Sequence, residues 1–395
     1  MAVLRDYIKV KHGFAFKGDH ISTEDNGIVL VTPGNFSIGG GFKEEKCKFF
    51  DGEYPSDYVL KPDDLIVTMT DLSKAVDTLG YSALVPNGKR IYLHNQRIGL
   101  VQIIDDASID KHFLYWFMRT PCYQKTIAAT SSGSTVHHTS PNRIMDVEIE
   151  LPDFKNQRLI ATFLDNIESK INTNKKINEN LEQQAQAIFS NEFLTLETLP
   201  DGWKQASLID IADYLNGLAM QKYCPTADES GIPVLKIKEL RQGCCDDNSE
   251  LCSPNIKSDY IIHDGDVIFS WSGSLLVDFW CGGICGLNQH LFKVTSNKYD
   301  KWFYYAWTKH HLDRFIAVAA DKATTMGHIK RDELSKAEVF IPNEADYNRI
   351  GAMLQPIYDL IIANRIENQK LAETRDTLLP KLMSGEIDIS EVDYE

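Results

Sequence analysis

The chain has 395 residues, 43% of them hydrophobic, and a formal net charge of −15. This acidity argues against a protein that binds DNA through a broad, non-specific basic surface, although a nearly neutral domain can still contact phosphates through a local patch. No run of about 18 apolar residues is present, so no membrane span is expected. Eight cysteines in a chain of this length indicate the reduced thiols of a cytoplasmic protein rather than a disulfide framework.

The chain consists of two similar halves, each a globular region followed by a long amphipathic helix. Four pairs of segments correspond in the same order: Gly13–Phe16 with Gly217–Met220, Asp64–Thr68 with Asp266–Ser270, Asn95-Gln96 with Asn288-Gln289, and Lys111–Tyr115 with Lys301–Tyr305. Solenoid repeats have periods of about 20–50 residues, so the much longer period here indicates duplicated domains.

Each globular region is expected to combine short strands with one helix. Apolar runs predict strands at Ile28–Val31, Leu65–Thr68, Ile98–Ile104, Val147–Leu151, Val234–Ile237, Val267–Ser270, Leu291–Val294 and Glu338–Ile341. Amphipathic spacing predicts one helix over Lys111–Ala129 and another over Lys301–Ala319. Both helices carry aromatic clusters, for which we favour a place in the domain core over an exposed platform for base stacking. These aromatics are Phe113, Tyr115, Trp116, Phe117, Phe303, Tyr304, Tyr305 and Trp307.

The long helices are the most regular feature of the sequence. Apolar residues recur at alternating steps of three and four after Leu151-Pro152 and again after Ile341-Pro342, which is typical of a coiled-coil seam. The polar interruptions match as well, and antiparallel pairing would place Asn174 against Asn368 and Asn178 against Asn364. Buried Asn pairs fix helix register at a cost in stability. Pro356 is expected to kink the second helix near its start.

Polar loops connect the predicted elements, and they are rich in Gly, Ser, Thr and Asn. They span residues 32–36, 68–74, 131–138, 270–274 and 322–328. Short polar side chains on turns suit hydrogen bonding to base edges and phosphates. They suit ordinary turns equally well.

No strong catalytic motif is present, neither a phosphate-binding Walker sequence nor a dinucleotide fingerprint. Pro152-Asp153 followed by Glu168 and Lys170 has the letter spacing of a nuclease, but Glu168 and Lys170 lie on the heptad helix, whereas nuclease ligands of that class lie on strands. Free thiols are favoured over a zinc site, because the cysteines include no pair separated by two residues. These cysteines are Cys244, Cys245, Cys252, Cys281 and Cys285.

Two similar domains joined by a pair of rods of about 45 Å would address one elongated partner. The major groove of duplex DNA recurs about every 34 Å, so two such domains suit two half-sites separated by an unread gap. In this arrangement of domain, helix, domain and helix, the chain resembles the DNA-specificity subunits of type I restriction–modification systems. The local resemblance lies in Gly133-Ser134-Thr135 with Leu151-Pro152 and Asn156–Ala161, in Thr325–Ile329 with Ile341-Pro342, and above all in Leu378–Ile387. The family usually has Glu-Gln before each helix; Asn156-Gln157 and Asp346-Tyr347 depart from it, which leaves open how the second helix starts.

The resemblance implies an α+β fold, with two mixed α/β target-recognition domains related by a pseudo-two-fold and joined by two helices in an antiparallel coiled coil. The expected boundaries are 1–152 for the first domain, 153–192 for the central helix, 193–341 for the second domain, 342–384 for the C-terminal helix and 385–395 for an acidic tail. The implied role is non-catalytic: the chain would bind double-stranded DNA and recruit two methyltransferase subunits. No cofactor is expected in this chain, because the methyltransferase partners would bind S-adenosylmethionine. Two motor–nuclease subunits using ATP and magnesium are a further partner that the resemblance leaves open. The competing interpretation is a protein–protein interaction scaffold that does not read DNA.

Loop residues are the candidates for DNA contact, because Lys and Arg suit phosphates or guanine, Asn and Gln suit adenine, and Asp suits cytosine. In the first domain they are Thr32, Asn35, Thr70, Asp71, Lys74, Gln96, Arg97, Ser134, Thr135 and His137. In the second domain they are Lys236, Lys238, Ser272, Ser274, Gln289, His290, Thr324, Thr325 and His328.

Overall fold

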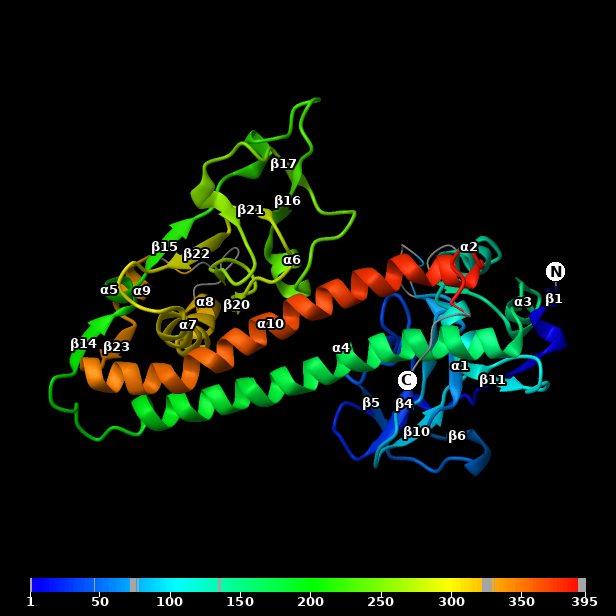
Figure 1. Ribbon diagram of the computed structural model, residues 1–395. Helices are drawn as coiled ribbons and strands as arrows, with labels where there is room; N and C mark the ends of the chain where they lie inside the picture. The colour runs from blue at the N-terminus through cyan, green and yellow to red at the C-terminus, as the bar shows by residue number, and fades with distance from the viewer. Residues whose placement is uncertain are drawn as a thin grey trace. The chain divides into compact units, whose positions relative to one another are not determined.

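The computed structural model describes residues 2–45, 47–71, 76, 78–133, 136–321, 329 and 331–389. The chain forms two compact units, Met1–Glu168 with Glu373–Glu395, and Ser169–Ala372. Helices α4 (Phe154–Phe189) and α10 (Glu344–Met383) each contribute to both units (Figure 1). The units therefore differ from the linear division expected from the sequence, because each globular domain packs with parts of both helices.

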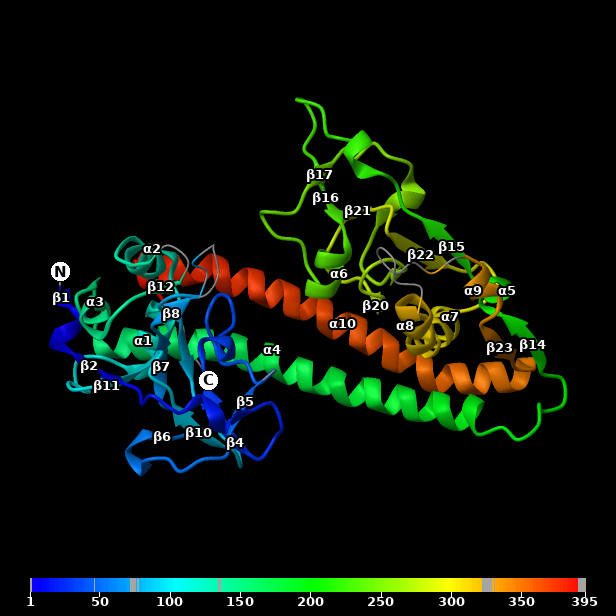
Figure 2. The same cartoon turned by 180° about the vertical axis from the view of Figure 1, so that it is seen from behind.

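The first unit contains two principal sheets. One is antiparallel, in the order β2 (Ile8–His12), β11 (Ile98–Ile103), β7 (Leu65–Thr68) and β9 (Ser82–Leu84). The other is mixed, in the order β3 (Ile21–Ser22), β5 (Lys48–Phe50), β4 (Ile28–Val31), β10 (Ile91–His94) and β6 (Val59–Leu60), with β4 and β10 parallel. Figure 2 shows these strands from behind. Two short pairs complete the unit: β1 (Ala2–Val3) with β13 (Glu148–Ile149), and β8 (Thr70–Asp71) with β12 (His137–His138).

The second unit repeats the main part of this plan, without a described counterpart of β3 or of the β8–β12 pair. Its antiparallel sheet has the order β15 (Asp213–Asn216), β22 (Leu291–Thr295), β19 (Val267–Ser270) and β20 (Leu276–Phe279). Its mixed sheet has the order β17 (Leu251–Cys252), β16 (Ile232–Leu235), β21 (Cys285–Leu287) and β18 (Ile261–Ile262), with β16 and β21 parallel. The pair β14 (Lys204–Ser207) and β23 (Glu338–Ile341) corresponds to β1 and β13. The predicted α+β fold of two duplicated domains is confirmed.

Short helices complete both units. The first has η1 (Leu4–Asp6), η2 (Gly18–His20), η3 (Pro33–Asn35), η4 (Ser56–Tyr58), α1 (Lys111–Phe117), α2 (Pro121–Ala129) and α3 (Pro141–Met145). The second has the π-helical turn η5 (Ser190–Leu194), α5 (Leu208–Ile211), η6 (Met220–Lys222), α6 (Ile237–Gln242), η7 (Ser258–Tyr260), α7 (Lys301–His310), α8 (Leu312–Asp321) and α9 (Arg331–Ser335).

The prediction of one continuous helix in each domain is wrong, because each helix is broken in the middle. In the first domain Thr120 caps α2, and Pro121 takes its first helical position, where a missing N–H costs least. In the second domain the break falls at His311, whose Nε2 lies 2.7 Å from the Glu338 carbonyl oxygen. The strands predicted at 147–151 and 234–237 are also shorter or shifted, at Glu148–Ile149 and Ile232–Leu235.

The aromatic clusters form domain cores, as favoured from the sequence. Trp116 and Phe113 have no exposed surface or almost none, and Phe303 and Trp307 lie in the core of the second unit with Ile350 and Leu354 of α10. Because these rings are enclosed, they are not available as a platform for base stacking. Their burial joins each globular domain to the helices that follow it.

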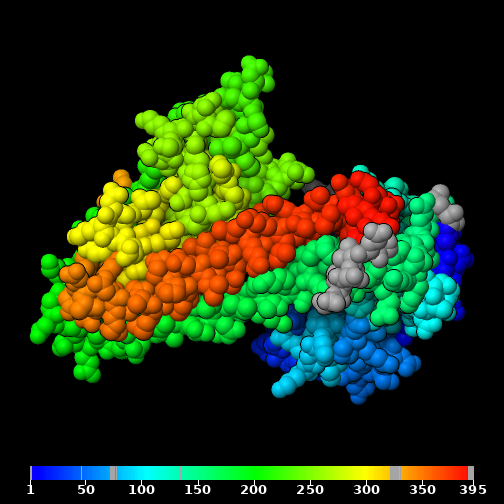
Figure 3. All heavy atoms as spheres, in the orientation of Figure 1, coloured from blue at the N-terminus to red at the C-terminus, as the bar shows by residue number. Residues whose placement is uncertain are grey.

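Within the second unit, α4 and α10 lie side by side and run in opposite directions (Figure 1). Asn174 donates to Asn368 Oδ1 at 2.9 Å, and Asn364 donates to Asn178 Oδ1 at 2.8 Å. These are the two pairs anticipated from the repeat. The spare amide protons also find acceptors, since Asn174 donates to a Glu367 carboxylate oxygen at 2.6 Å and Asn178 to the Ile361 carbonyl at 3.2 Å. In Figure 3 the orange part of α10 lies at the surface of this unit.

Within the first unit, the start of α4 packs against the end of α10. Ile160 and Leu164 of α4 share a buried core with Leu379 and Leu382 of α10. Glu168, which the nuclease-like letter pattern included, lies within α4 and accepts a hydrogen bond from Arg375 of α10 at 2.6 Å. Both units therefore contain an antiparallel pair of helix segments, and each pair packs against the core of the domain in its unit.

The two long helices begin in the same way despite their different sequences. Asp153 Oδ1 accepts the Asn156 amide at 2.9 Å, and Asn343 Oδ1 accepts the Asp346 amide at 2.9 Å. One residue further on, Gln157 Oε1 accepts the Asp110 amide at 2.9 Å. In the second copy the Tyr347 hydroxyl oxygen accepts the equivalent Asp300 amide at 2.7 Å. The two copies therefore use different side chains for the equivalent hydrogen bond.

Helix α10 continues without interruption through Pro356. The proline leaves one carbonyl of the preceding turn without its helical partner, but the packing of Leu354, Tyr358 and Ile361 holds the segment in place. Among the described residues, no helix combines the length and hydropathy that crossing a bilayer requires.

The Asn178–Asn364 pair gives the first test. Asn178→Leu should lower the free energy of unfolding by about 1–3 kcal/mol, because the Asn364 amide then stays buried without its partner. Asn178→Leu with Asn364→Leu should recover much of that loss, since both amides leave the seam. Urea unfolding of both variants measures the effect, with Asn180→Leu on the exposed face of α4 as the control. Additive losses in the double variant would contradict a paired role.

Candidate nucleic-acid interface

A tight turn after the parallel strand is built identically in both domains. In the first, buried Asn95 accepts the Arg97 amide at 3.0 Å on Oδ1, and its carbonyl accepts the Ile98 amide at 3.0 Å. In the second, buried Asn288 accepts the His290 amide at 3.2 Å, and its carbonyl accepts the Leu291 amide at 3.0 Å. The asparagine fixes the backbone from inside, so the next two residues are presented on the outside.

A glycine lets a neighbouring segment close against each turn. A Cβ on Gly13 would lie 2.0 Å from the Asn95 carbonyl oxygen, and one on Gly217 would lie 2.2 Å from the Asn288 carbonyl oxygen. No side chain fits at such distances, so the close approach requires glycine. It also allows the Phe14 carbonyl to accept the Gln96 amide at 2.9 Å. The Gly-x-Ala segments that revealed the duplication therefore support the turns.

A second loop leaves the sheet beside each turn. The carboxyl ends of parallel strands lie at the same edge of a sheet, and here Val31 pairs with His94 and Leu235 with Leu287. The residues that follow, Thr32 and Lys236, therefore emerge next to the turns. Each loop is closed by a capping side chain: Asn35 accepts the Thr32 amide at 2.9 Å, and Glu239 accepts the Lys236 amide at 3.2 Å.

A third segment crosses the same edge in both domains. In the first, Met69 donates its amide to the Arg97 carbonyl at 2.9 Å, and its own carbonyl accepts the Thr139 amide at 3.0 Å. In the second, the Trp271 carbonyl accepts the Ile329 amide at 3.1 Å. The loops that the sequence analysis treated separately therefore converge on one face of each domain.

The candidates of the first domain divide by exposure. Gln96 and Arg97 are exposed at the tip of the turn, and Thr32 and His137 are half-buried beside it. Within the described residues, no hydrogen bond or ion pair engages the Arg97 guanidinium, which leaves it available to an anion or a base edge. His137 pairs with Asp71 through the backbone of β12 and β8.

Three candidates of the first domain need correction, because they are buried and bonded within it. Asn35 is 1% exposed and closes its own loop. Asp71, also 1% exposed, accepts the Thr78 amide at 2.7 Å. The Thr70 hydroxyl lies 3.1 Å from His138 Nδ1. These side chains shape the loops and cannot reach a base edge in this arrangement.

In the second domain Lys238 and Ser274 are exposed, and Lys236, Gln289 and His290 are half-buried. Ser272 needs correction, since it is 2% exposed and lies inside its loop. Both lysines have acidic partners: Lys236 pairs with Glu250, and Lys238 with Asp246 at 2.9 Å, a hydrogen bond that raises the lysine pKa. Their charges are partly compensated, which weakens their attraction for phosphate.

Six candidates lie outside the described residues, and nothing is concluded about them. They are Lys74, Ser134, Thr135, Thr324, Thr325 and His328.

Two surface residues were missed by the candidate set. Trp271 is half-buried, with its ring stacked on Phe292 at 5.6 Å between centroids and 6.3 Å from the His290 ring. His138 is exposed on β12, opposite Thr70. Trp271 occupies the position equivalent to Met69, and a large aromatic residue within a polar loop was the available signal. Unlike the enclosed core rings, it borders the turn and can offer part of its face to a base.

His94 lies directly beneath the turn of the first domain. It is fully buried, its Nε2 lies 2.8 Å from the Ile98 carbonyl oxygen, and its Nδ1 has no partner among the described residues. Burial lowers the pKa of His94 to about 4, although the hydrogen bond to Ile98 opposes the shift. The imidazole is therefore neutral at physiological pH and serves the turn as a packed core group.

Within the described ranges, no three His, Cys, Asp or Glu side chains are placed to hold a metal ion. The eight cysteines are free, and burial raises the pKa of the Cys281 thiol to about 12. The face formed by the converging loops therefore offers hydrogen-bond donors, acceptors and a cation, which suit recognition of a polar surface.

Comparison with known proteins agrees with this geometry. The family model for the type I restriction modification DNA specificity domain matches residues 3–183 and 200–373, once for each copy of the repeat. The chain is 26% identical over 339 residues to the type I restriction enzyme MjaIX specificity subunit of Methanocaldococcus jannaschii, which covers 80% of this chain and 76% of that protein. It is 24% identical over 263 residues to the EcoBI specificity subunit of Escherichia coli, which covers 60% of this chain and 52% of that protein.

The fold is also found in a solved structure. The type I restriction–modification S subunit from M. genitalium superposes with a TM-score of 0.57 at 15% identity, covering 98% of this chain and 96% of that one. At this identity the likeness concerns the fold alone.

The glycine beneath each turn gives a second test. Gly13→Ala should destabilise the first domain by a few kcal/mol, because a backbone carbonyl stands in the way of the new methyl group. Thermal unfolding and faster hydrogen exchange of the Gln96 amide measure the effect. Gly18→Ala is the matched control, because nothing lies within 4 Å of the added atom. Equal stability of both variants would show that the turn can move aside.

His94 gives a pH-dependent test. Its folded-state pKa of about 4 lies below the ordinary value of 6.5, so between these values the unfolded chain binds a proton that the folded chain does not. The free energy of unfolding therefore has its full value, as far as His94 is concerned, above pH 6.5. It falls by on the order of 2–3 kcal/mol as the pH drops toward 4, because protonation then favours the unfolded chain. His94→Gln should flatten this part of the curve of stability against pH, measured by urea unfolding between pH 7.5 and 4.5. Exposed His20→Gln is the control, and an unchanged slope in His94→Gln would refute the assignment.

Proposed function

The chain belongs to the family of type I restriction–modification DNA specificity domains, and from that premise we propose that it reads a two-part target in double-stranded DNA. Each globular domain would contact one half-site through the loops that converge at its parallel-strand edge. The paired helices would set the length of the gap between the half-sites. Contacting a half-site and setting the gap are both non-catalytic roles, so partner subunits would carry out the chemical reaction.

The observation that carries the proposal is the duplicated turn. Both domains keep the buried asparagine, the supporting glycine, the backbone hydrogen bonds and a glutamine at the tip, but the residue after that glutamine differs. The first offers Gln96 and Arg97, and the second offers Gln289 and His290. A constant scaffold with variable tips is what two related domains need in order to read two different sequences.

The chemistry of the tips suits base edges in the major groove. An arginine can donate two hydrogen bonds to the O6 and N7 of guanine, and a glutamine can bond N6 and N7 of adenine. Arg97 is free for this role within the described structure, whereas Lys236 and Lys238 are held by acids and suit weaker contact with phosphates. The net charge of −15 agrees with modest affinity for DNA in the absence of partners.

The helices offer a surface for the partners. Lys175, Lys176 and Glu179 are exposed on α4, and the orange part of α10 lies at the surface in Figure 3. We place two methyltransferase subunits on this surface, each supplying bound S-adenosylmethionine for transfer of a methyl group to adenine. Motor–nuclease subunits with ATP and magnesium are a further partner that the proposal does not require.

Mapping of methylated adenines tests the proposal. The chain is expressed with its methyltransferase in a host that lacks adenine methylation, and the modified positions are read across the genome. A two-part motif with a fixed gap is expected. A protein-binding scaffold without DNA readout would leave no such motif, and that result would refute the proposal.

Two single substitutions then assign the halves. Arg97→Ala should lower discrimination about tenfold at one position of one half-site, and Gln289→Ala should do so in the other half-site, because each removes a base contact worth about 1–3 kcal/mol. Each variant controls for the other, and Lys89→Ala, an exposed change away from the turn, should leave both halves intact. Loss of specificity in both halves from either substitution would contradict independent reading.

A further inference from the structure

One arginine of the second unit joins three parts of the structure. Arg365 of α10 donates to Asp278 Oδ1 at 2.6 Å, on β20 of the second domain. Its other terminal nitrogen donates to Glu182 Oε1 of α4 at 2.8 Å. The guanidinium also lies 3.5 Å from the Phe279 carbonyl oxygen. Both long helices and the domain that carries the reading loops therefore meet at one side chain.

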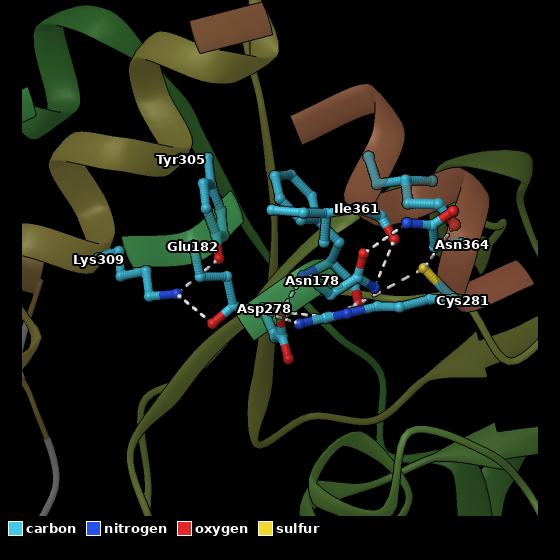
Figure 4. Close-up of polar contacts among 11 residues, drawn as sticks. Asn178, Glu182, Asp278, Cys281, Tyr305, Lys309, Ile361 and Asn364 are labelled. Carbon is cyan, nitrogen blue, oxygen red and sulfur yellow. Dashed lines mark hydrogen bonds and ion pairs between the residues drawn. The ribbon is translucent and has the colours of Figure 1, made fainter. Parts of the chain in front are cut away.

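The surroundings of this contact are ordered by further interactions, several of which Figure 4 shows. Glu182 also pairs with Lys309 of α7 at 3.8 Å, and Lys309 donates to the Tyr305 hydroxyl at 3.1 Å. The Tyr305 ring stacks on Phe279 with 3.8 Å between centroids. The carboxylate of α4 thus receives one cation from α10 and one from the domain.

The contact lies directly beside the pair that relates the two helices. Asn364, the residue before Arg365, bonds Asn178 at 2.8 Å, and Arg365 bonds Glu182 one helical turn further along α4. Arg365 therefore attaches the domain to the part of the helix pair where the asparagines fix the register. A shift of α10 by one turn would separate the arginine from both carboxylates, and a shift of α4 would separate it from Glu182.

Apolar contacts alone would not define this orientation. Ile350, Leu354 and Ile361 of α10 pack against the domain core, and such packing is non-directional. A guanidinium held by two carboxylates is directional, because its planar donors accept partners at fixed angles. Burial disfavours the charged form of Arg365, yet Asp278 and Glu182 outweigh this effect and raise its pKa, so the charge is retained.

The first unit has a similar cluster around a carboxylate of α4. There Glu168 of α4 lies between two cations, Arg375 of α10 at 2.6 Å and Arg119 of the first domain at 3.9 Å. Arg119, which is equivalent to Lys309, is fixed over the Trp116 ring at 4.2 Å and donates to the Gly39 carbonyl at 2.7 Å. Among the described residues, Arg375 of α10 bonds two acids of the helices, Glu168 and Asp376, whereas Arg365 also bonds Asp278 of the domain.

We propose that Arg365 is a positioning residue that locks the second domain onto the helix pair through Asp278 and Glu182, and thereby restricts DNA recognition to one gap length. The inference rests on the proposed function. Arg365 touches no base in this role. It acts by fixing the angle at which the reading loops leave the helices, so a looser domain would accept half-sites at neighbouring spacings.

The test compares gap lengths at constant half-site sequence. The chain and its methyltransferase act on duplexes that carry both half-sites, with the gap native or changed by one or two base pairs. With Arg365→Ala, the methylation rate on altered gaps relative to the native gap should rise about fivefold or more, the scale that a partly buried ion pair confers. The half-site motif should stay the same. Arg365→Lys should give an intermediate profile, because one ammonium cannot hold both carboxylates in the same geometry.

Arg349→Ala is the matched control. Arg349 also lies on α10 and also binds two carboxylates, Glu192 at 2.7 Å and Asp346 at 3.4 Å, but neither belongs to the sheets of the second domain. Its gap profile should match that of the unchanged protein. Asp278→Asn removes the charge that pairs with Arg365 from the side of the domain. If Arg365→Ala does not fold, the gap profile of Asp278→Asn tests the positioning role instead.

The outcomes separate the two proposals. A narrow gap profile in folded Arg365→Ala, or in Asp278→Asn, would overturn the positioning role while leaving two-part recognition intact. An altered half-site motif would show that Arg365 acts on base reading instead. Absence of any two-part site for the unchanged protein would refute the proposed function itself.

Discussion

The pairing of α4 with α10 depends on amide groups placed in an apolar seam. Hydrophobic residues at alternating steps of three and four bring two helices together, but they allow several registers, because one leucine can replace another. Asn178 and Asn364 remove that freedom in the second unit, since a slip would leave buried amides facing aliphatic side chains. The remaining amide protons of Asn174 and Asn178 bond Glu367 and the Ile361 carbonyl. Few buried amide groups of the polar centre are therefore left without a hydrogen-bond partner, which keeps its cost in stability small.

The two globular domains share their scaffold but differ in residues that the scaffold presents. The antiparallel sheets and four strands of each mixed sheet have the same order, and the two domains share the glycine beneath the turn, the buried asparagine and the capped loop that follows the first parallel strand. These features hold the backbone in place from within. At the tips, Gln96 and Arg97 are exposed and Gln289 and His290 are half-buried, so these side chains are less constrained than the buried asparagines. Such a tip can change without any change to the scaffold, which supports our proposal that the two domains read different half-sites.

The junctions between domains and helices show the same principle with different chemistry. The amides of Asp110 and Asp300 each bond a side chain at the start of a long helix, although one partner is Gln157 and the other is Tyr347. In both units a glutamate of α4 receives one cation from α10 and one from the domain, and in the second unit the arginine of α10 also bonds Asp278 of the domain. Each domain is thus attached to the helices, although different side chains make the attachment in the two units.

Much of this organisation could be predicted from the sequence, because periodicity and repetition are local patterns. The heptad spacing, the duplicated segments and the matched asparagines defined two domains, two antiparallel helices and the residues that meet across them. Other features depended on contacts between distant segments. The break at His311 carries no proline signal, and the burial of Asp71 and Asn35 follows from amides and carbonyls that fold back onto them. The convergence of three loops at one sheet edge required the parallel pairing of β4 with β10, which no single segment encodes. The sequence determined which side chains were candidates, and the tertiary structure decided which of them face solvent, because exposure is a property of neighbours that lie far away along the chain.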